Sequence, residues 1–280
     1  MPAELPKLAL GTWLMGGTKE ADPNNDDAKD IAVIHTAIEN DVTLIDTAQN
    51  YAAGKCEELV GKAISKYSRQ SYQILTKQSK DALHYDAVIK GCHDSMQRLG
   101  VEYVDYFVCH APTKDADMRD FFKASNQLYK DGFIRNVGVS NFGPKTLAIA
   151  LETSDLPISL NQVSFSLGDD DILTTGTYDF CVENNIPIQA FRALARLGED
   201  TQLISLLLPI AEKHGLTAHQ TALAYLNSYK NVNFTIRASN KEHWQQIKKA
   251  LNVALAAEET EQLRKVQTGK QGAFHEFLLV

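Results

Sequence analysis

The chain has 280 residues, a length that suits either one α/β barrel domain or two smaller domains. Lys plus Arg total 28 and Asp plus Glu total 35, so the formal net charge is −7, which argues against nonspecific nucleic-acid binding as the main function. No apolar stretch approaches the roughly 18 residues of a membrane span, and the N-terminus lacks the basic head and apolar run of a signal peptide. We therefore expect a cytoplasmic protein without a membrane segment. Its 4 cysteines have no CxxC spacing, so we expect reduced thiols.

Short apolar or β-branched runs recur along the chain, and longer segments with helical periodicity separate them. Repeated strand–helix units in sequence favour a parallel sheet closed into a (β/α)8 TIM barrel over an open doubly wound sheet. The runs are LALGTW (8–13), VTLID (42–46), YQILTK (72–77), YVDYFVCH (103–110), IRNVGVSN (134–141), ISLNQ (158–162), IPIQAF (186–191) and VNFTIR (232–237).

No linker rich in glycine, serine or proline divides the chain, so we predict a single domain over residues 1–280. The unit between the last two runs is longer than the others and holds two helical patterns, roughly 200–213 and 217–229. The stretch AEETEQLRKV (257–266) predicts one more helix, followed by a short tail. We therefore expect an eightfold barrel with extra helices near the C-terminus.

Several consecutive runs end on a polar residue. In a barrel of this type the side chains beyond the C-terminal ends of the strands converge on one mouth, where chemistry is done. We therefore expect these side chains to lie close together. They are Asp46, Lys77, His110, Ser140 with Asn141, and Gln162.

The types of these residues suit proton transfer to an oxygen. A tyrosine with an ordinary pKa near ~10 donates poorly unless its phenolate is stabilised, and a neighbouring ammonium does this. Asp46, Lys77 and Tyr51 can form such a relay, and His110 can orient a carbonyl group by a hydrogen bond. Each residue alone has a structural explanation: Asp46 can cap a turn, and Lys77 can be a solvated charge.

At these residues the sequence resembles the aldo-keto reductase family, and the resemblance covers nearly the whole chain. LALGTW is similar to the opening strand of that family, and LIDTAQNY with EELVGKAI is similar to its Asp-to-Tyr segment. ILTK resembles the lysine strand, DSMQRLGVEYVDYFVCH the helix turn and histidine strand, and DGFIRNVGVSNF the most recognisable phrase of the family.

The resemblance implies a TIM barrel that binds a nicotinamide cofactor in extended form, and the chain indeed has no GxGxxG fingerprint after a strand. It implies a catalytic tetrad of Asp46, Tyr51, Lys77 and His110, with Tyr51 as the general acid in reduction. Asp46 would also border the cofactor. The remaining residues implied to contact the cofactor near its nicotinamide are Gly11, Thr12, Trp13, Ser140, Asn141 and Gln162.

Two segments depart from the family pattern. After the seventh strand the chain reads AFRALAR, where we expect Phe191 to stack on the nicotinamide. Cofactor contacts are also predicted here for Arg192, Leu194 and Arg196, and the two arginines could meet the pyrophosphate or be plain solvated charges. After the eighth strand the chain reads TIRASN, and Arg237, Ser239 and Asn240 suit a 2′-phosphate. We therefore expect NADP(H) as the preferred cofactor, with NAD(H) possible.

Substrate contacts are predicted for Trp13, Tyr51, His110 and Ala111. Ala111 stands where many family members carry tryptophan, and the tail is short, so we expect a relatively open site. The GDDD stretch (168–171) lacks the spaced carboxylates of a calcium loop and is predicted to be a solvated turn, and we expect no metal site.

The leading hypothesis is reversible, NADP(H)-dependent reduction of aldehydes or ketones to alcohols by a monomeric enzyme that acts on a small carbonyl substrate. One alternative is a cofactor-sensing auxiliary subunit like that of potassium channels, although nothing resembling an inactivating extension precedes LALGTW. The other is an aldolase in which Lys77 forms a Schiff base, although a paired Asp46 disfavours a neutral lysine.

Overall fold

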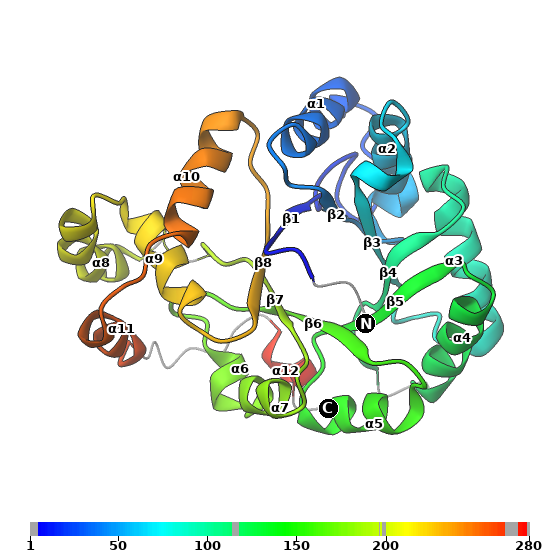
Figure 1. Ribbon diagram of the computed structural model, residues 1–280. Coiled ribbons are helices and arrows are strands. Elements are labelled where there is room, and N and C mark those ends of the chain that lie inside the picture. Colours follow the sequence, from blue (N-terminus) through cyan, green and yellow to red (C-terminus); the bar gives the residue numbers. More distant parts are fainter. Residues whose placement is uncertain (1–4, 114–117, 196, 198–199, 267–273, 279–280) are drawn as a thin grey trace.

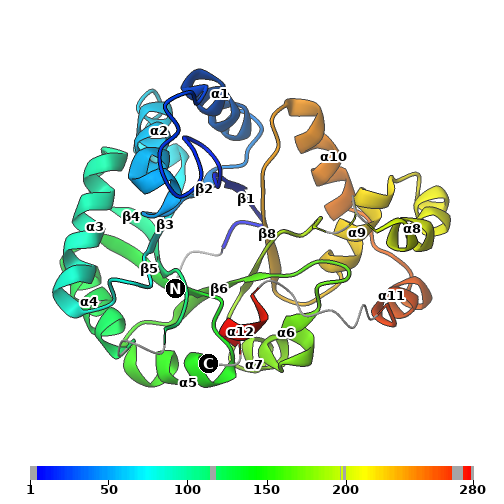
Figure 2. The ribbon, with the colours of Figure 1, turned by 180° about the vertical axis from the view of Figure 1, so that it is seen from behind.

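Eight parallel strands form a closed barrel, and each strand pairs with its neighbours in chain order (Figures 1 and 2). The computed structural model describes residues 5–113, 118–195, 197, 200–266 and 274–278. Strand β1 closes the barrel by pairing with β8, with Ala9 opposite Thr235. The strands are β1 (Leu8–Gly11), β2 (Leu44–Asp46), β3 (Gln73–Gln78), β4 (Val104–Cys109), β5 (Ile134–Ser140), β6 (Ile158–Ser164), β7 (Ile188–Phe191) and β8 (Val232–Ile236).

The helices surround the barrel, and the two predicted helical patterns between β7 and β8 are confirmed as α8 and α9 (Figure 1). Short 3₁₀ helices are present at η1 (Tyr51–Gly54) and η2 (Arg69–Ser71). The α-helices are α1 (Asp27–Ile38), α2 (Lys55–Ile64), α3 (Tyr85–Leu99), α4 (Arg119–Lys130), α5 (Pro144–Thr153), α6 (Asp171–Thr174), α7 (Thr177–Glu183), α8 (Thr201–His214), α9 (Ala218–Asn227), α10 (Lys241–Leu251), α11 (Ala257–Arg264) and α12 (His275–Leu278).

Local signals set the ends of several helices. Helix α9 begins with a capping box in which Thr217 and Gln220 satisfy each other's backbone amides. Helix α8 begins at Asp200, whose carboxylate accepts from two backbone amides, and it ends at Gly215 in the left-handed region. Helix α5 has Pro144 in its first turn, where the missing amide proton costs nothing.

Two separate apolar layers hold the barrel, because successive side chains of a strand point to opposite faces. The larger layer fills the space between strands and helices and includes Ile45, Ile74 and Phe107. A smaller cluster lies inside the barrel and consists of Leu5, Ala9, Leu44, Leu75, Tyr106, Val108 and Leu160.

The polar residues at the strand ends continue the inner layer. Each one stands two positions after an apolar residue of the inner cluster or after a glycine, so it points into the same interior space at the C-terminal mouth. The pairs are Leu44 and Asp46, Leu75 and Lys77, Val108 and His110, Gly138 and Ser140, and Leu160 and Gln162. The barrel therefore brings these polar side chains together, as the sequence predicted.

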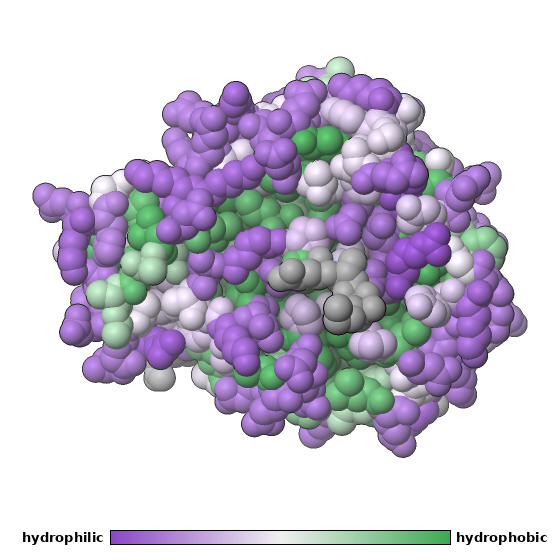
Figure 3. Space-filling view, viewed as in Figure 1, coloured by the Kyte–Doolittle hydropathy of each residue, from purple (hydrophilic) through white to green (hydrophobic). Residues whose placement is uncertain are grey.

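The surface over the outer helices is mostly hydrophilic, and hydrophobic side chains show in the hollows between them (Figure 3). This distribution agrees with helices that bury one face against the strands. Within the described residues, no helix combines the length and the apolarity that a membrane crossing requires.

The prediction of a solvated turn at residues 168–171 is wrong. Asp169 and Asp171 are only 3% and 6% exposed. The turn folds inward after β6 because the Ser164 hydroxyl donates to the Asp169 carboxylate at 2.7 Å and Asp171 pairs with His275 of α12 at 3.0 Å. These two carboxylates are therefore engaged with the protein.

Candidate active site

Lys77 lies at the centre of the polar layer and is fully buried. Its ammonium donates to the Asp46 carboxylate, to the Thr47 carbonyl at 2.9 Å and to the Tyr51 hydroxyl at 3.2 Å. Three acceptors match the three protons of an ammonium group, so the buried charge is completely hydrogen-bonded. The relay that the sequence predicted is therefore assembled in the barrel mouth.

Asp46 is held on both carboxylate oxygens. One oxygen faces Lys77, and the other accepts from the Gln162 amide at 2.9 Å and from the Thr235 hydroxyl at 2.9 Å. The first loop supports the same strand end, because the backbone amide and the hydroxyl of Thr12 both donate to the Asp46 carbonyl. The orientation of the carboxylate is thus fixed by side chains from three other strands, β3, β6 and β8.

Tyr51 reaches this cluster from an unusual turn. Ala52 and Ala53, which follow it, have φ angles of 49° and 53°, in the left-handed region that alanine rarely adopts. The backbone amide of Ala52 donates to the Thr18 carbonyl at 2.7 Å, which holds the turn. The Tyr51 ring contacts Trp13 edge-on, with 4.8 Å between ring centroids, and contacts His110 at 5.7 Å.

The electrostatics favour a charged lysine beside a neutral tyrosine. Burial disfavours the Lys77 charge, but Asp46 and Tyr51 together outweigh it and raise the pKa of Lys77. Burial also raises the pKa of Tyr51 above its ordinary value, and Lys77 only partly opposes this effect. The direction for Tyr51 is opposite to the one expected from sequence, because the ring is partly buried against Trp13 and His110 and burial disfavours the phenolate. Tyr51 therefore keeps its proton at neutral pH.

His110 is neutral at physiological pH. Burial, with a smaller contribution from the Lys77 charge, lowers the pKa of His110 from 6.5 to about 3. Its Nδ1 atom is buried and has no hydrogen-bond partner among the described residues. A neutral imidazole at this position can hydrogen-bond an oxygen without adding a positive charge.

A pocket of about 550 Å³ opens above this cluster. Its volume suits a small ligand or part of a larger one. Apolar rings and polar strand ends share its walls, and most of the predicted site residues are among them. The lining residues are Gly11, Thr12, Trp13, Leu14, Asp46, Asn50, Tyr51, His110, Ser140, Asn141, Gln162, Phe191, Arg192, Thr235, Arg237 and Phe274.

Ser140, Asn141 and Gln162 form a connected polar wall. The Ser140 hydroxyl donates to the Gln162 carbonyl at 2.9 Å and accepts from the Asn141 amide at 3.1 Å. Asn141 has a φ of 61°, and its amide nitrogen also donates to the His110 carbonyl at 3.2 Å. Its Oδ1 atom is buried without a hydrogen-bond partner in the described part of the chain, so this wall keeps one acceptor for a ligand.

Two arginines stand at the outer edge of the pocket. Arg192 is exposed and has a φ of 57°. Arg237 donates to the Trp13 carbonyl at 3.2 Å and pairs with Asp30 at 3.2 Å. Arg237 therefore joins the end of β8 to the loop after β1, and its side chain keeps 36% of its surface exposed.

Five of the described residues predicted from sequence do not line the pocket. Lys77 is fully buried and contacts Asp46 and Tyr51, which do line it. Ala111 is buried, and its carbonyl accepts from the Cys109 thiol at 3.4 Å. Leu194 packs against the main core. Ser239 and Asn240 are exposed at the start of α10, where the Asn240 side chain caps the helix by accepting from His243 at 2.8 Å. Arg196 lies outside the described residues.

Four lining residues were not predicted from sequence: Leu14, Asn50, Thr235 and Phe274. Leu14 follows the predicted Trp13 and Asn50 precedes the predicted Tyr51, so their position in the sequence was the signal that could have found them. Thr235 is a polar residue near the end of a predicted strand, and the rule that polar strand ends meet at the barrel mouth could have found it. Phe274 comes from the C-terminal segment, and its ring meets Phe191 edge-on at 4.9 Å. A residue of the C-terminal tail thus joins the pocket wall beside Phe191, and the relatively open site stays a prediction.

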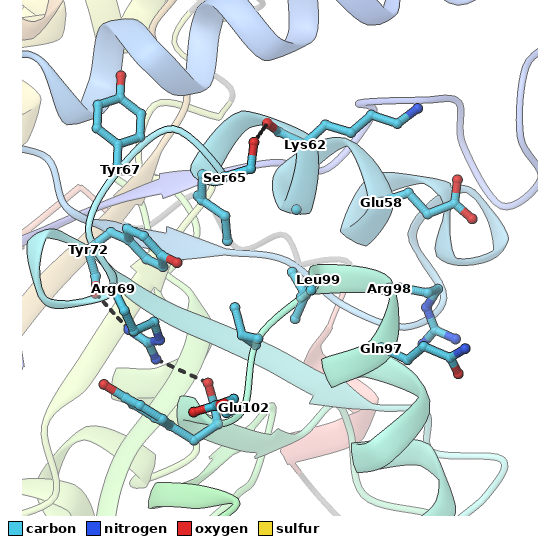
Figure 4. A pocket seen from close by; sticks show the side chains of 15 residues that line it. Glu58, Lys62, Ser65, Tyr67, Arg69, Tyr72, Gln97, Arg98, Leu99 and Glu102 are labelled. Atoms are coloured by element: carbon cyan, nitrogen blue, oxygen red, sulfur yellow. Dashed lines mark hydrogen bonds between the residues drawn. The ribbon is translucent and has the colours of Figure 1, made fainter.

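A wider depression of about 990 Å³ lies elsewhere, on the outer surface between α2 and the end of α3 (Figure 4). Its two arginines are engaged with the protein: Arg69 donates to the Tyr72 carbonyl and pairs with Asp105, and Arg98 pairs with Glu57. No polar strand end reaches this depression. We therefore place the candidate active site in the barrel mouth.

Comparison with known proteins agrees with this geometry. The model of the Aldo/keto reductase family matches residues 7–268. The chain belongs to the aldo-keto reductase family. The family resemblance and the barrel predicted from sequence are thus confirmed, and the chain shares the fold of a family of oxidoreductases.

Individual aldo-keto reductases match over almost their whole length. Methylglyoxal reductase YeaE of Escherichia coli (strain K12) is 30% identical, and the match covers 96% of this chain and 93% of the relative. The thermostable aldo-keto reductase Tm1743, solved with the inhibitor epalrestat, is 33% identical with a TM-score of 0.88, over 92% of this chain and 94% of that one. An aldo-keto reductase from Klebsiella pneumoniae, solved with NADPH, is 28% identical with a TM-score of 0.83, over 96% and 94%.

Proposed function

We propose that this aldo-keto reductase catalyses the reversible, NADP(H)-dependent reduction of small aldehydes or ketones to alcohols. The observation that carries the proposal is the buried Asp46–Lys77–Tyr51 chain of contacts on the pocket floor, with His110 beside the tyrosine ring. The names of relatives give further support, because one of them is a methylglyoxal reductase and one solved neighbour contains NADPH.

Each member of the tetrad has a defined part in the proposed reduction. Tyr51 keeps its proton at neutral pH and gives it to the carbonyl oxygen of the substrate. Lys77 remains charged beside the phenol and stabilises the phenolate that is left, while Asp46 holds the ammonium in place. The neutral His110 orients the carbonyl oxygen toward Tyr51 by a hydrogen bond.

The residues around the pocket fit a nicotinamide cofactor, which when bound would supply hydride to the carbonyl carbon. The free Oδ1 of Asn141 is a buried acceptor of the kind that a carboxamide NH₂ group would satisfy. Ser140 and Gln162 complete that polar wall, and Phe191 supplies an aromatic face beside it. Gly11, Thr12 and Trp13 would border the cofactor on the β1 side.

The phosphates are assigned to the outer edge of the same pocket. Arg192 is exposed and suits the pyrophosphate, and Arg237 is oriented by Asp30 and suits the 2′-phosphate. Ser239 and Asn240 stay predictions for the same phosphate, since they lie at the start of α10, two and three residues beyond Arg237. An arginine guanidinium aimed at a phosphate is the feature that favours NADP(H) over NAD(H).

The aldolase alternative is disfavoured by the contacts of Lys77. A Schiff base requires a neutral amine as nucleophile. The Lys77 ammonium is fully hydrogen-bonded beside Asp46, which raises its pKa and keeps the charge on the nitrogen.

The proposal is tested by following the loss of reduced-nicotinamide absorbance across a panel of carbonyl compounds that includes methylglyoxal, simple aldehydes and ketones. Each compound is run with NADPH and with NADH. We expect turnover with NADPH, weaker turnover with NADH, and formation of the carbonyl compound from its alcohol with NADP⁺. Absence of turnover with either cofactor, in a chain that nevertheless binds NADPH, would favour the cofactor-sensing alternative.

Replacing Arg237 by alanine should weaken NADPH much more than NADH. Hydrogen bonds to a charged group contribute about 1.5–3 kcal/mol, so we expect the Kd for NADPH to rise by roughly 10-fold to 100-fold. Binding is measured by quenching of protein fluorescence. Arg192→Ala is the matched control, because loss of a pyrophosphate contact weakens both cofactors equally. An equal effect of Arg237→Ala on NADPH and NADH would contradict the assignment.

A further inference from the structure

Thr235 lies on β8 and directs its hydroxyl at the Asp46 carboxylate from the far side of β1. The distance from Thr235 Oγ1 to Asp46 Oδ2 is 2.9 Å, and a carboxylate has no proton, so the hydroxyl donates. Gly11, which pairs with Asp46 on the intervening strand β1, carries no side chain to separate the two groups. The contact therefore spans two strand intervals around the barrel.

The hydroxyl acts on the oxygen that faces away from Lys77. Asp46 Oδ1 faces the ammonium, and Oδ2 has two donors, Thr235 and the Gln162 amide. Gln162 Nε2 has two protons and donates one to Asp46 and the other to the Gln189 side chain at 2.7 Å, while the single proton of the Thr235 hydroxyl goes to Asp46. Gln162 is also the residue proposed to meet the nicotinamide carboxamide. Thr235 is thus the donor committed to Asp46.

We propose that Thr235 is a positioning residue that holds the Asp46 carboxylate against Lys77 and thereby tunes Tyr51 as the proton donor. The proposal rests on the proposed reductase function. Without the hydroxyl, Oδ2 keeps the Gln162 amide as its one remaining donor, so the carboxylate is held less firmly against the ammonium. A less firmly held ammonium stabilises the Tyr51 phenolate less, and the pKa of Tyr51 rises further.

Other ionisable groups surround this relay, and they stay the same when Thr235 is changed. The groups of the relay and those that face it are Lys77 on β3, Tyr51 in η1, Cys56 on α2 and His110 directly after β4. A change in the pH dependence of Thr235→Val therefore reports the missing hydroxyl, because valine matches the shape of threonine and removes only the donor.

Alcohol oxidation gives the first measurement, since it needs the ionised form of Tyr51 as base. In Thr235→Val the acidic limb of the pH profile of kcat for oxidation should move to higher pH. At a fixed pH on that limb, a shift of one pH unit lowers kcat about tenfold. The KM for NADP⁺ should stay within about twofold. Thr235→Ser should restore the wild-type limb, because serine keeps the hydroxyl.

The Lys77 ammonium gives a second measurement that needs neither cofactor nor turnover. A buried ammonium with three acceptors exchanges its protons slowly, so a ¹H–¹⁵N spectrum of the cofactor-free protein should show its signal, assigned by loss in Lys77→Met. In Thr235→Val the exchange of this signal should accelerate several-fold, and in Thr235→Ser it should not.

Thr76→Val is the matched control. The Thr76 hydroxyl donates to the buried Glu57 carboxylate at 2.5 Å, on the outer face of β3 beside Lys77. The same substitution there removes the same kind of hydrogen bond without touching Asp46. We expect neither the oxidation limb nor the Lys77 exchange to move.

Two results would overturn the inference. In the first, Thr235→Val changes neither the acidic limb of kcat for alcohol oxidation nor the proton exchange of the Lys77 ammonium. In the second, Thr235→Val and Thr76→Val shift these two quantities equally. If the wild-type chain shows no oxidoreductase turnover while its Lys77 exchange still depends on Thr235, the proposed function fails and the positioning role stands.

Discussion

Replacing Tyr51 by phenylalanine should lower kcat for carbonyl reduction by roughly 100-fold to 10,000-fold, the usual contribution of a positioned proton donor. The hydroxyl is the one group that the substitution removes, and it accepts from Lys77 at 3.2 Å. The ring would keep its edge-on contacts with Trp13 and His110, so the pocket walls stay in place. We therefore expect NADPH affinity within about twofold of wild type.

The measurement pairs steady-state kinetics with direct titration of NADPH. Tyr129→Phe removes a phenolic hydroxyl from the exposed face of α4, where the side chain has no part in the pocket, and serves as the control. Its kcat should equal that of wild type. A Tyr51→Phe variant that reduced aldehydes at the wild-type rate would show that the proton comes from another group.

The same tyrosine sets the pH dependence of reduction. Reduction needs the protonated phenol, and burial raises the pKa of Tyr51 above its ordinary value. Rates should therefore stay level as pH rises through neutrality, and fall only above that raised pKa. His110, with a pKa near about 3, stays neutral over the same range and adds no inflection. The relay thus works in one protonation state across the physiological range.

The polar layer could be predicted from sequence because it depends on local periodicity. A strand places alternate residues on one face, so an apolar residue such as Leu75 fixes the direction of Lys77 two positions later. The same rule places Asp46 and Gln162 in the barrel mouth. All eight predicted runs are confirmed as strands, although several are shorter: the run predicted over 186–191 forms a strand only over Ile188–Phe191.

Contacts between distant segments could not be predicted in this way. Phe274 reaches the pocket because α12 packs beside α6, where His275 pairs with Asp171, and no strand periodicity carries that information. Arg237 was predicted as a phosphate ligand, but its pairing with Asp30 joins residues 207 positions apart. The pKa of Tyr51 also depends on such packing, since the burial that raises it comes from the folded loops around Trp13.

The tetrad should also be a determinant of stability, and replacing Lys77 by methionine should test this. The Lys77 side chain is 0% exposed and that of Asp46 is 3% exposed. Methionine fills a similar volume but leaves the Asp46 carboxylate buried without its cation. Breaking a buried ion pair on one side costs about 3–5 kcal/mol, which for a domain of this size lowers the Tm by roughly 6–20 °C. Carbonyl reduction should fall at least as far as in Tyr51→Phe.

A double-mutant cycle separates the two consequences of this substitution. Asp46→Asn alone leaves the Lys77 charge unpaired and should also destabilise the fold, whereas the double variant Asp46→Asn/Lys77→Met contains no buried charge at this position. Thermal and denaturant unfolding should show that the double variant recovers most of the lost free energy of unfolding. Its kcat should stay low, because Tyr51 still lacks the ammonium that stabilises its phenolate. If the destabilisations of the two single variants simply added in the double variant, the buried pair would not be the coupled unit described here.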